Sequence, residues 1–155
     1  MKKLFIFLLP LLFLGCKNNK NQVQESKVSE SRLAFSFERT PCFGTCAEYV
    51  LTVYENGEAK FEGKKNTDLI GSYTCDDCDE EMMHRVMKTA GRINFWQLED
   101  KYDPGVADLP STITTIYLKE PPKSVVNVMG APVELTELEK QIDDYYLKRN
   151  WSKID

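Results

Sequence analysis

The sequence predicts an α+β domain, an antiparallel sheet of about six strands with two helices packed on one face. Three observations support this class. Short stretches alternate apolar and polar residues, as half-buried strands do. An Asn-Gly pair between two such stretches indicates a tight hairpin, and two longer stretches repeat apolar residues at helical spacing. Along the chain these patterns predict four strands, a helix, two strands and a helix.

Four strands are predicted in the first half of the domain. The alternation is clearest where Leu33, Phe35 and Phe37 stand between smaller or polar residues. Asn56-Gly57 separates the second and third strands, because both positions of a tight hairpin turn favour positive φ. The expected strands cover residues 33–38, 49–54, 59–62 and 69–74.

The second half predicts two helices with two strands between them. Asp79-Glu80-Glu81 opens the first helix, since acidic side chains favour the positive end of the helix dipole. After a loop over 102–111, β-branched residues predict strands at 112–118 and 125–128. Pro132 introduces the last helix, because proline is favoured at the first helical position. The two apolar faces comprise Met83, Val86, Met87, Ala90 and Ile93, and then Leu135, Leu138, Ile142 and Tyr145.

Composition limits the classes of function. The chain has 155 residues, 42% hydrophobic and 28% charged, with a net charge of −4. These values describe one ordinary globular domain and exclude a collagen-like or wholly disordered chain. A nucleic-acid partner is not expected, because such a surface needs clustered cations. No cofactor and no catalytic residue are expected either, since no phosphate-binding loop, G-x-S-x-G or H-E-x-x-H motif is present.

The N-terminus has the pattern of an export signal. Met1-Lys2-Lys3 provides positive charge, and residues 4–14 are almost continuously apolar. That run is shorter than the roughly 20 residues that span a bilayer, and it has the size of a signal-peptide core. Leu14-Gly15-Cys16 then resembles the lipobox of bacterial lipoproteins. The resemblance implies that residues 1–15 are a signal peptide and that Cys16 carries fatty acyl chains such as palmitate.

A polar segment separates the expected anchor from the folded domain. Residues 17–31 contain two valines and otherwise only polar or charged side chains, too few apolar groups to offset chain entropy. We therefore expect a flexible tether over 16–31, one domain over 32–150 and a tail over 151–155. Some surface-exported lipoproteins carry an acidic run directly after the lipidated cysteine, but no such run follows Cys16. We expect a cell-envelope protein, anchored in the outer membrane and facing the periplasm.

Thr40-Pro41-Cys42-Phe43-Gly44-Thr45-Cys46 is the most specific motif of the chain. Further segments accompany it: Tyr49, Tyr54-Glu55-Asn56-Gly57, Asn94-Phe95-Trp96, Tyr102, Asp108-Leu109-Pro110-Ser111-Thr112 and Gly130-Ala131-Pro132. Together they resemble an uncharacterised bacterial lipoprotein family, a domain of unknown function marked by T-P-C-F-G-x-C. The resemblance covers nearly all of the folded part. It implies a fold and a compartment but no known activity.

With Cys16 assigned to lipid, four cysteines remain: Cys42, Cys46, Cys75 and Cys78. An exported, oxidising location makes disulfides the default for an even set. We favour the local pairs Cys42–Cys46 and Cys75–Cys78, with Gly44 giving the first loop its backbone freedom. Crossed pairing between the two segments stays open, because a larger ring restricts the unfolded chain more.

Two other interpretations of these cysteines stay open. The spacings C-x₃-C and C-x₂-C suit a Cys₄ zinc site, which needs only four thiolates. Cys75-Asp76-Asp77-Cys78 also lies between a strand and a helix, as a reactive dithiol would, although its acidic neighbours disfavour a thiolate. The chain would then be a zinc-binding module or an envelope thiol-disulfide oxidoreductase.

The preferred function is binding or envelope structure without catalysis. The contact surface is expected on the loop from Pro41 to Cys46, with Pro41, Phe43, Gly44 and Thr45 as binding residues. A constrained loop loses less entropy when it binds. The expected partners are the membrane, through the N-terminal lipid, and an envelope protein.

Overall fold

Residues 31–154 are the part of the chain that the computed structural model describes. They contain eight strands, two α-helices and one short 3₁₀ helix. The strands are β1 (Leu33–Arg39), β2 (Glu48–Tyr54), β3 (Ala59–Lys65), β4 (Gly71–Cys75), β5 (Lys101–Tyr102), β6 (Thr112–Ile116), β7 (Lys123–Asn127) and β8 (Trp151–Lys153). The helices are α1 (Glu80–Arg92), η1 (Phe95–Gln97) and α2 (Val133–Tyr146).

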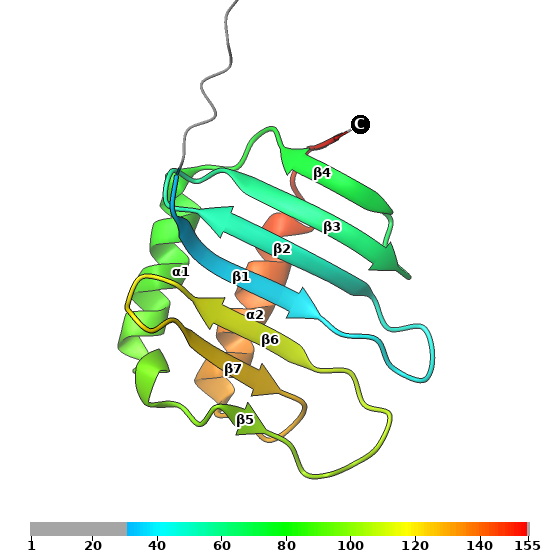
Figure 1. The fold of residues 1–155 in the computed structure, drawn as a ribbon, viewed down its shortest axis with the longest axis vertical. Helices are drawn as coiled ribbons and strands as arrows, with labels where there is room; N and C mark the ends of the chain where they lie inside the picture. The colour runs from blue at the N-terminus through cyan, green and yellow to red at the C-terminus, as the bar shows by residue number, and fades with distance from the viewer. Residues whose placement is uncertain (1–30, 155) are drawn as a thin grey trace, which may run out of the picture.

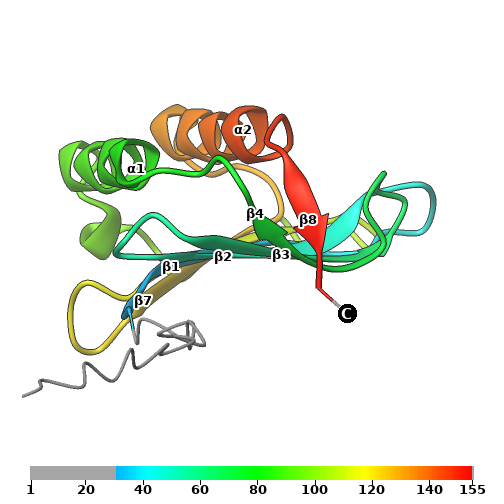
Figure 2. The same cartoon turned by 90° about the horizontal axis from the view of Figure 1, so that it is seen from above.

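The strands form a single sheet in the order β5-β7-β6-β1-β2-β3-β4-β8 (Figure 1). Neighbouring strands are antiparallel except β5 and β7, which run parallel. Both α-helices lie on the same face of this sheet (Figure 2). The domain is therefore α+β, with a mixed, mostly antiparallel sheet and two helices on one face.

The predicted number of about six strands is wrong, because two short strands at the edges of the sheet were missed. β5 occupies Lys101–Tyr102, at the start of the expected loop, and β8 occupies Trp151–Lys153, within the expected tail. Strands of two or three residues are too short to show an alternating pattern. They form because their backbones pair with β7 and β4. The domain thus extends beyond residue 150.

The core lies between the sheet and the helices. Alternation in β2 turns Tyr49, Leu51 and Val53 toward the helices, where all three are buried. Helix α1 begins as the acidic triplet predicts, with the Asp79 side chain accepting a hydrogen bond from the Met82 backbone N–H. Neither α-helix of residues 31–154, nor η1, is long and apolar enough to cross a membrane.

The predicted Asn-Gly hairpin connects β2 and β3 and also contacts α1. Gly57 adopts a φ of +83°, a conformation that side chains disfavour. A Cβ atom at this position would lie 2.4 Å from the backbone nitrogen of Glu80. Glycine is therefore required both for the turn and for the close packing of the hairpin on the start of α1.

The two ends of the strands have different neighbours. Leu33 of β1 pairs with Tyr54 at one end, and Arg39 pairs with Tyr49 at the other. We call the end with Leu33 the proximal end, because the chain enters the sheet there, and the end with Arg39 the distal end. The loop over 40–47 leaves β1 at the distal end (Figure 1).

Candidate functional site

The four cysteines of the domain form two local disulfides. Cys42 is joined to Cys46 and Cys75 to Cys78, with Cα–Cα distances of 5.7 and 5.6 Å. These are the pairs that the sequence favoured, and the crossed pairing is not found. We call residues 42–46 the first disulfide loop and residues 75–78 the second.

The two loops lie at opposite ends of the sheet. The first precedes β2, whose Glu48 pairs with Lys65 at the distal end. The second follows Thr74, which pairs with Lys60 near the proximal end of β3. A Cys₄ zinc site requires all four sulfurs at about 2.3 Å from one ion. The alternative of a four-cysteine zinc site is therefore inconsistent with the fold.

One smaller group of metal-ligating side chains occurs within residues 31–154. Cys75, Asp77 and Cys78 place their ligand atoms within 4.8 Å of one another. The two sulfurs are bonded to each other, however, and thiolates are the form of cysteine that binds metals. In this oxidised form the group has one carboxylate left as a ligand.

The first disulfide loop has an anchored base and an exposed tip. Thr40 receives a hydrogen bond from the Ser111 backbone N–H (2.7 Å) and donates its own backbone N–H to the Ser111 carbonyl (3.0 Å). Asn66 donates to the Cys46 carbonyl from the other side (3.1 Å). The Phe43 side chain is 93% exposed. The other predicted binding residues are also exposed: Pro41, Gly44 and Thr45.

A polar cavity of about 260 Å³ lies beside the base of this loop, between the distal end of the sheet and α2. Its wall includes two acidic, two basic and several hydroxyl or amide side chains. The polar side chains of the wall include Arg39, Ser111, Thr112, Asn127, Glu139, Lys140 and Asp143. No pattern in the sequence predicted this cavity, although the motif segment 108–112 contributes Pro110, Ser111 and Thr112 to its wall.

Arg39 is fixed in the cavity wall by partners on two elements. Its guanidinium donates to the Thr112 hydroxyl of β6 and to the Asp143 carboxylate of α2, which also accepts from the Tyr49 hydroxyl. Burial alone would lower the pKa of Arg39, but the hydrogen bond and charge of Asp143 outweigh it, and the pKa is raised. Burial, with the charge of Asp143, also raises the pKa of Tyr49. Arg39 therefore stays charged and Tyr49 stays a neutral donor.

Glu139 is the buried acid of the same wall. Only 3% of the residue is exposed. Its Oε2 accepts a hydrogen bond from the Asn127 side-chain amide (2.8 Å), whereas its buried Oε1 has no hydrogen-bond partner. Burial raises the pKa of Glu139 to about 7, although Asn127 and Arg39 oppose the shift. The carboxyl group therefore changes its charge close to neutral pH.

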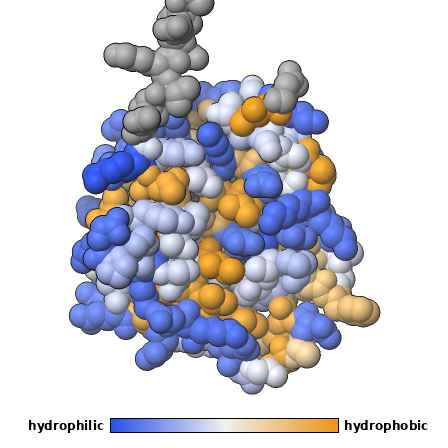
Figure 3. Space-filling view, viewed as in Figure 1, coloured by the Kyte–Doolittle hydropathy of each residue, from blue (hydrophilic) through white to orange (hydrophobic). Residues whose placement is uncertain are grey.

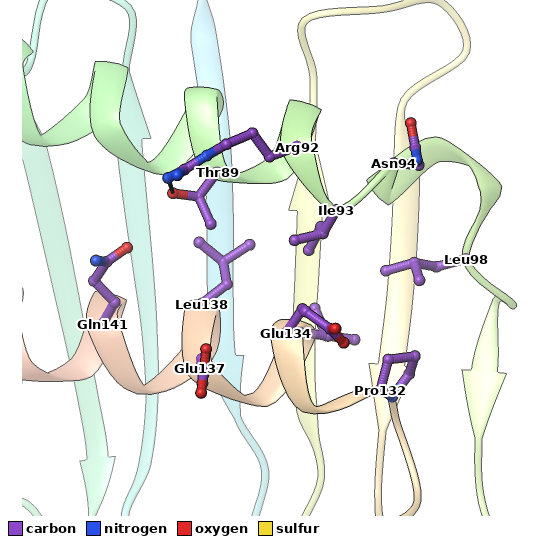
Figure 4. Close-up of a pocket in the computed structure, with 11 residues that line it drawn as sticks. Thr89, Arg92, Ile93, Asn94, Leu98, Pro132, Glu134, Glu137, Leu138 and Gln141 are labelled. Atoms are coloured by element: carbon purple, nitrogen blue, oxygen red, sulfur yellow. Dashed lines mark hydrogen bonds between the residues drawn. The ribbon is translucent and has the colours of Figure 1, made fainter.

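A larger, open groove separates the two α-helices (Figure 4). It encloses about 630 Å³. Figure 4 shows Thr89 facing Leu138 across it and Ile93 facing Glu134, with Arg92 hydrogen-bonded to Thr89 on the α1 side (3.0 Å). Among the described residues, no buried side-chain atom without a hydrogen-bond partner belongs to its lining. The described lining of this groove thus lacks a buried polar atom without a hydrogen-bond partner, such as Glu139 Oε1 in the cavity beside Arg39.

The sheet face away from the helices is open. Registers between strands align a row of hydroxyl side chains across β7, β6, β1 and β2, and the next row is mostly aliphatic. The first row is Ser124, Thr115, Ser36 and Thr52; the second is Val126, Ile113, Glu38 and Val50. Figure 3 shows hydrophobic and hydrophilic side chains interspersed over this face. No single kind of side chain therefore predominates on this face.

Fold and site together define an α+β domain that carries an exposed disulfide loop beside a polar cavity. The chain belongs to the family described as Domain of unknown function (DUF6438), whose model matches residues 33–146. The expected membership of an uncharacterised domain family is thus confirmed. Comparisons with curated proteins and with solved structures found no match. The matched range includes both disulfide loops and the polar cavity, and it ends before β8.

Proposed function

We propose that the chain is a lipid-anchored protein of the cell envelope whose domain is a non-catalytic binding module facing the periplasm. The anchor rests on the sequence alone, because Cys16 and residues 1–15 lie outside the described residues. Two disulfides in one small domain are consistent with an oxidising compartment, where such bonds form and persist. The outer membrane is the proposed site of anchoring.

The exposed Phe43 is the observation that carries the binding proposal. An aromatic side chain left 93% exposed gains roughly 1.5–3 kcal/mol when a partner buries it fully. The Cys42–Cys46 bond and the hydrogen bonds of Thr40 restrict the loop before any partner arrives. Preorganisation of this kind reduces the entropy that association costs. The first disulfide loop therefore suits a contact with an envelope protein.

The position of the loop relative to the chain's N-terminal side supports the same proposal. The chain enters β1 at Leu33 and reaches the loop after Arg39. Seven residues of strand extend about 23 Å at roughly 3.3 Å per residue. A lipid on Cys16 would therefore be joined to the domain at its proximal end, the end opposite the loop.

The anchor is tested by intact-mass analysis of the membrane fraction from cells that make the full chain. We expect a product that begins at Cys16 and carries fatty acyl chains, and a Cys16→Ser variant that loses both lipid and membrane association. A product with an unmodified Cys16 thiol, or a variant that stays in the membrane, would contradict the anchor.

The contact surface is tested with two matched variants. Phe43→Ala removes the exposed ring of the loop, and Leu118→Ala removes a side chain that is also exposed but lies outside the loop. We expect envelope proteins that co-purify with the unmodified chain to be lost with Phe43→Ala and kept with Leu118→Ala. Equal retention of partners by both variants would exclude the loop as the contact surface.

A thiol-disulfide oxidoreductase is the second candidate, and one observation favours it. Cys75 and Cys78 are partly exposed and stand directly before α1, the usual position of a reactive dithiol. In such a reaction the two thiols pass two electrons and two protons to a substrate disulfide. A reduction potential near that of the glutathione pool would support this activity, whereas a structural disulfide resists reduction by glutathione.

A further inference from the structure

We propose that the polar cavity binds a small zwitterion of the amino-acid class, a molecule that carries both an ammonium group and a carboxylate. This inference goes beyond the proposed function, because it assigns a ligand to the cavity beneath α2 and does not depend on the loop or the lipid anchor. It rests on the two kinds of polar group in the cavity wall.

Glu139 supplies the acceptor for the ammonium group, which the side chain would meet by turning its buried Oε1 toward the cavity. Its Oε1 is buried without a hydrogen-bond partner, while Asn127 holds the other oxygen in position. A buried acceptor left unsatisfied costs about 1–3 kcal/mol, and more when the group is charged. An ammonium ion supplies both the missing donor and a compensating positive charge, so it removes this penalty.

Arg39 is placed to receive the carboxylate. A guanidinium has five N–H donors in a planar fork, which suits the two oxygens of a carboxylate. Thr112 and Asp143 are its hydrogen-bond acceptors among the described residues, and they engage its two terminal nitrogens. Donors therefore remain on a side chain that is already held in place. Lys140 and Ser111 also line this wall, where the Lys140 ammonium is paired with Asp144 and the Ser111 hydroxyl is hydrogen-bonded to Thr40.

Charge and size limit the class of ligand. Arg39 is the cation and Glu139 the unpaired acid of the wall, because Asp143 is paired with Arg39 and the Lys140 ammonium is paired with Asp144. A ligand with one charge of each sign matches this balance better than an anion or a cation does. A volume of about 260 Å³ is just below the roughly 300–1,000 Å³ typical of drug-sized ligands. It suits an amino acid with a small side chain.

Binding should also depend on pH through Glu139. The groups that line the cavity with it are Arg39 of β1, Thr112 of β6, Asn127 of β7, and Lys140 and Asp143 of α2. Because burial holds the pKa of Glu139 at about 7, the free carboxyl group is largely protonated well below that pH. The protonated form attracts an ammonium ion less, so affinity should fall as the pH is lowered.

The test is an NMR titration of the full chain in detergent micelles, observing the Asn127 side-chain amide. The probes are glycine and L-alanine, with acetate and methylammonium as single-charge controls. At about pH 8 we expect saturable shifts with both amino acids and at least tenfold weaker binding of either control ion. Glu139→Gln should weaken amino-acid binding about tenfold or more. Glu137→Gln, on the same helix but in the α1–α2 groove, should leave it unchanged.

Any of four results would overturn the proposal. The cavity holds only water if neither amino acid shifts the Asn127 amide up to about 50 mM. The ligand class is wrong if acetate or methylammonium binds as well as glycine. The assigned residue is wrong if Glu139→Gln binds as the unmodified chain does. If Glu139→Gln does not fold, the unmodified chain still decides, because affinity that is constant between about pH 5.5 and 8 contradicts a role for Glu139.

Discussion

The two disulfide loops share the same bond but differ in what surrounds them. The first disulfide loop is anchored only at its base, and its tip presents Phe43 to solvent. The second is tied to the C-terminal segment along its length. Its Asp77 carboxylate accepts from the Asn150 backbone and side-chain amides (both 2.9 Å), and Asp76 accepts from the Ser152 hydroxyl (2.8 Å).

This difference indicates that the second loop constrains the fold and that the first loop is the contact surface. Closing a ring of about four residues restricts the unfolded chain by ~2 kcal/mol in the chain-entropy model, and the value is similar for both loops. The second loop adds more native contacts than the first, because its cysteines pack against the core and its acids hold β8 beside β4. The second loop is therefore mainly structural, and the first leaves its side chains free for a partner.

Removal of the second disulfide should have the largest effect on stability. We expect Cys75→Ser with Cys78→Ser to lower the free energy of unfolding by about 3–4 kcal/mol, ~2 from the lost ring and the rest from weakened hydrogen bonds to Asn150 and Ser152. Chemical denaturation measures it. The control, Cys42→Ser with Cys46→Ser, should lose only ~2 kcal/mol. Equal losses would remove the distinction between the loops.

The acid buried at the distal end should make stability depend on pH. The pKa of Glu139 is about 7 in the folded protein, whereas a glutamate exposed in the unfolded chain has its ordinary pKa of 4.5. Between these two pH values the folded state therefore binds more protons than the unfolded state. Stability should therefore fall as the pH rises from 4.5 to about 7 and then level off. Glu139→Gln should abolish this contribution and be more stable at pH 8 by about 3 kcal/mol. Denaturation midpoints across this pH range test it, and identical profiles would contradict the burial of the charge.

The acids of the second loop should contribute less than its disulfide. We expect Asp77→Ala to lower the free energy of unfolding by about 1–2 kcal/mol, because the Asn150 backbone and side-chain amides lose their acceptor. Thr45→Ala in the first loop is the matched exposed control and should change stability by less than about 0.5 kcal/mol. A larger effect at Thr45 than at Asp77 would reverse the roles assigned to the two loops.

Phe43 should contribute least to folding. Its side chain is 93% exposed, so Phe43→Ala should change the free energy of unfolding by less than about 0.5 kcal/mol. The same change should weaken binding of an envelope partner about tenfold or more, since the ring is buried only in the complex. Thermal unfolding and partner affinity are measured on one preparation. A clear loss of stability would show that Phe43 supports the fold instead.

Local patterns predicted the parts of the fold that depend on neighbouring residues. The Asn56-Gly57 hairpin, the start of α1 at Asp79 and the short-range cysteine pairs all follow from spacing within a few residues. β5 and β8 show no alternating pattern of their own. They were missed because they form only by backbone pairing with strands that are distant in the sequence.

The polar cavity could not be predicted in the same way. Arg39 and Asp143 are separated by 104 positions and meet only when β1 packs under α2. One signal was present, however: Glu139 falls among Leu135, Leu138 and Ile142 on the buried face of α2. A charged side chain is almost never fully buried without a partner, so its place on an apolar helix face indicates a buried polar site.

Photocrosslinking tests the central contrast between the two loops most directly. A photoreactive phenylalanine analogue is placed at position 43 or, as the matched control, at position 76 in the second loop, in the full chain made in its own cells. If the first disulfide loop is the contact surface, we expect a discrete crosslinked envelope protein from position 43 and none from position 76. Crosslinking from position 76 alone, or equally from both positions, would contradict it.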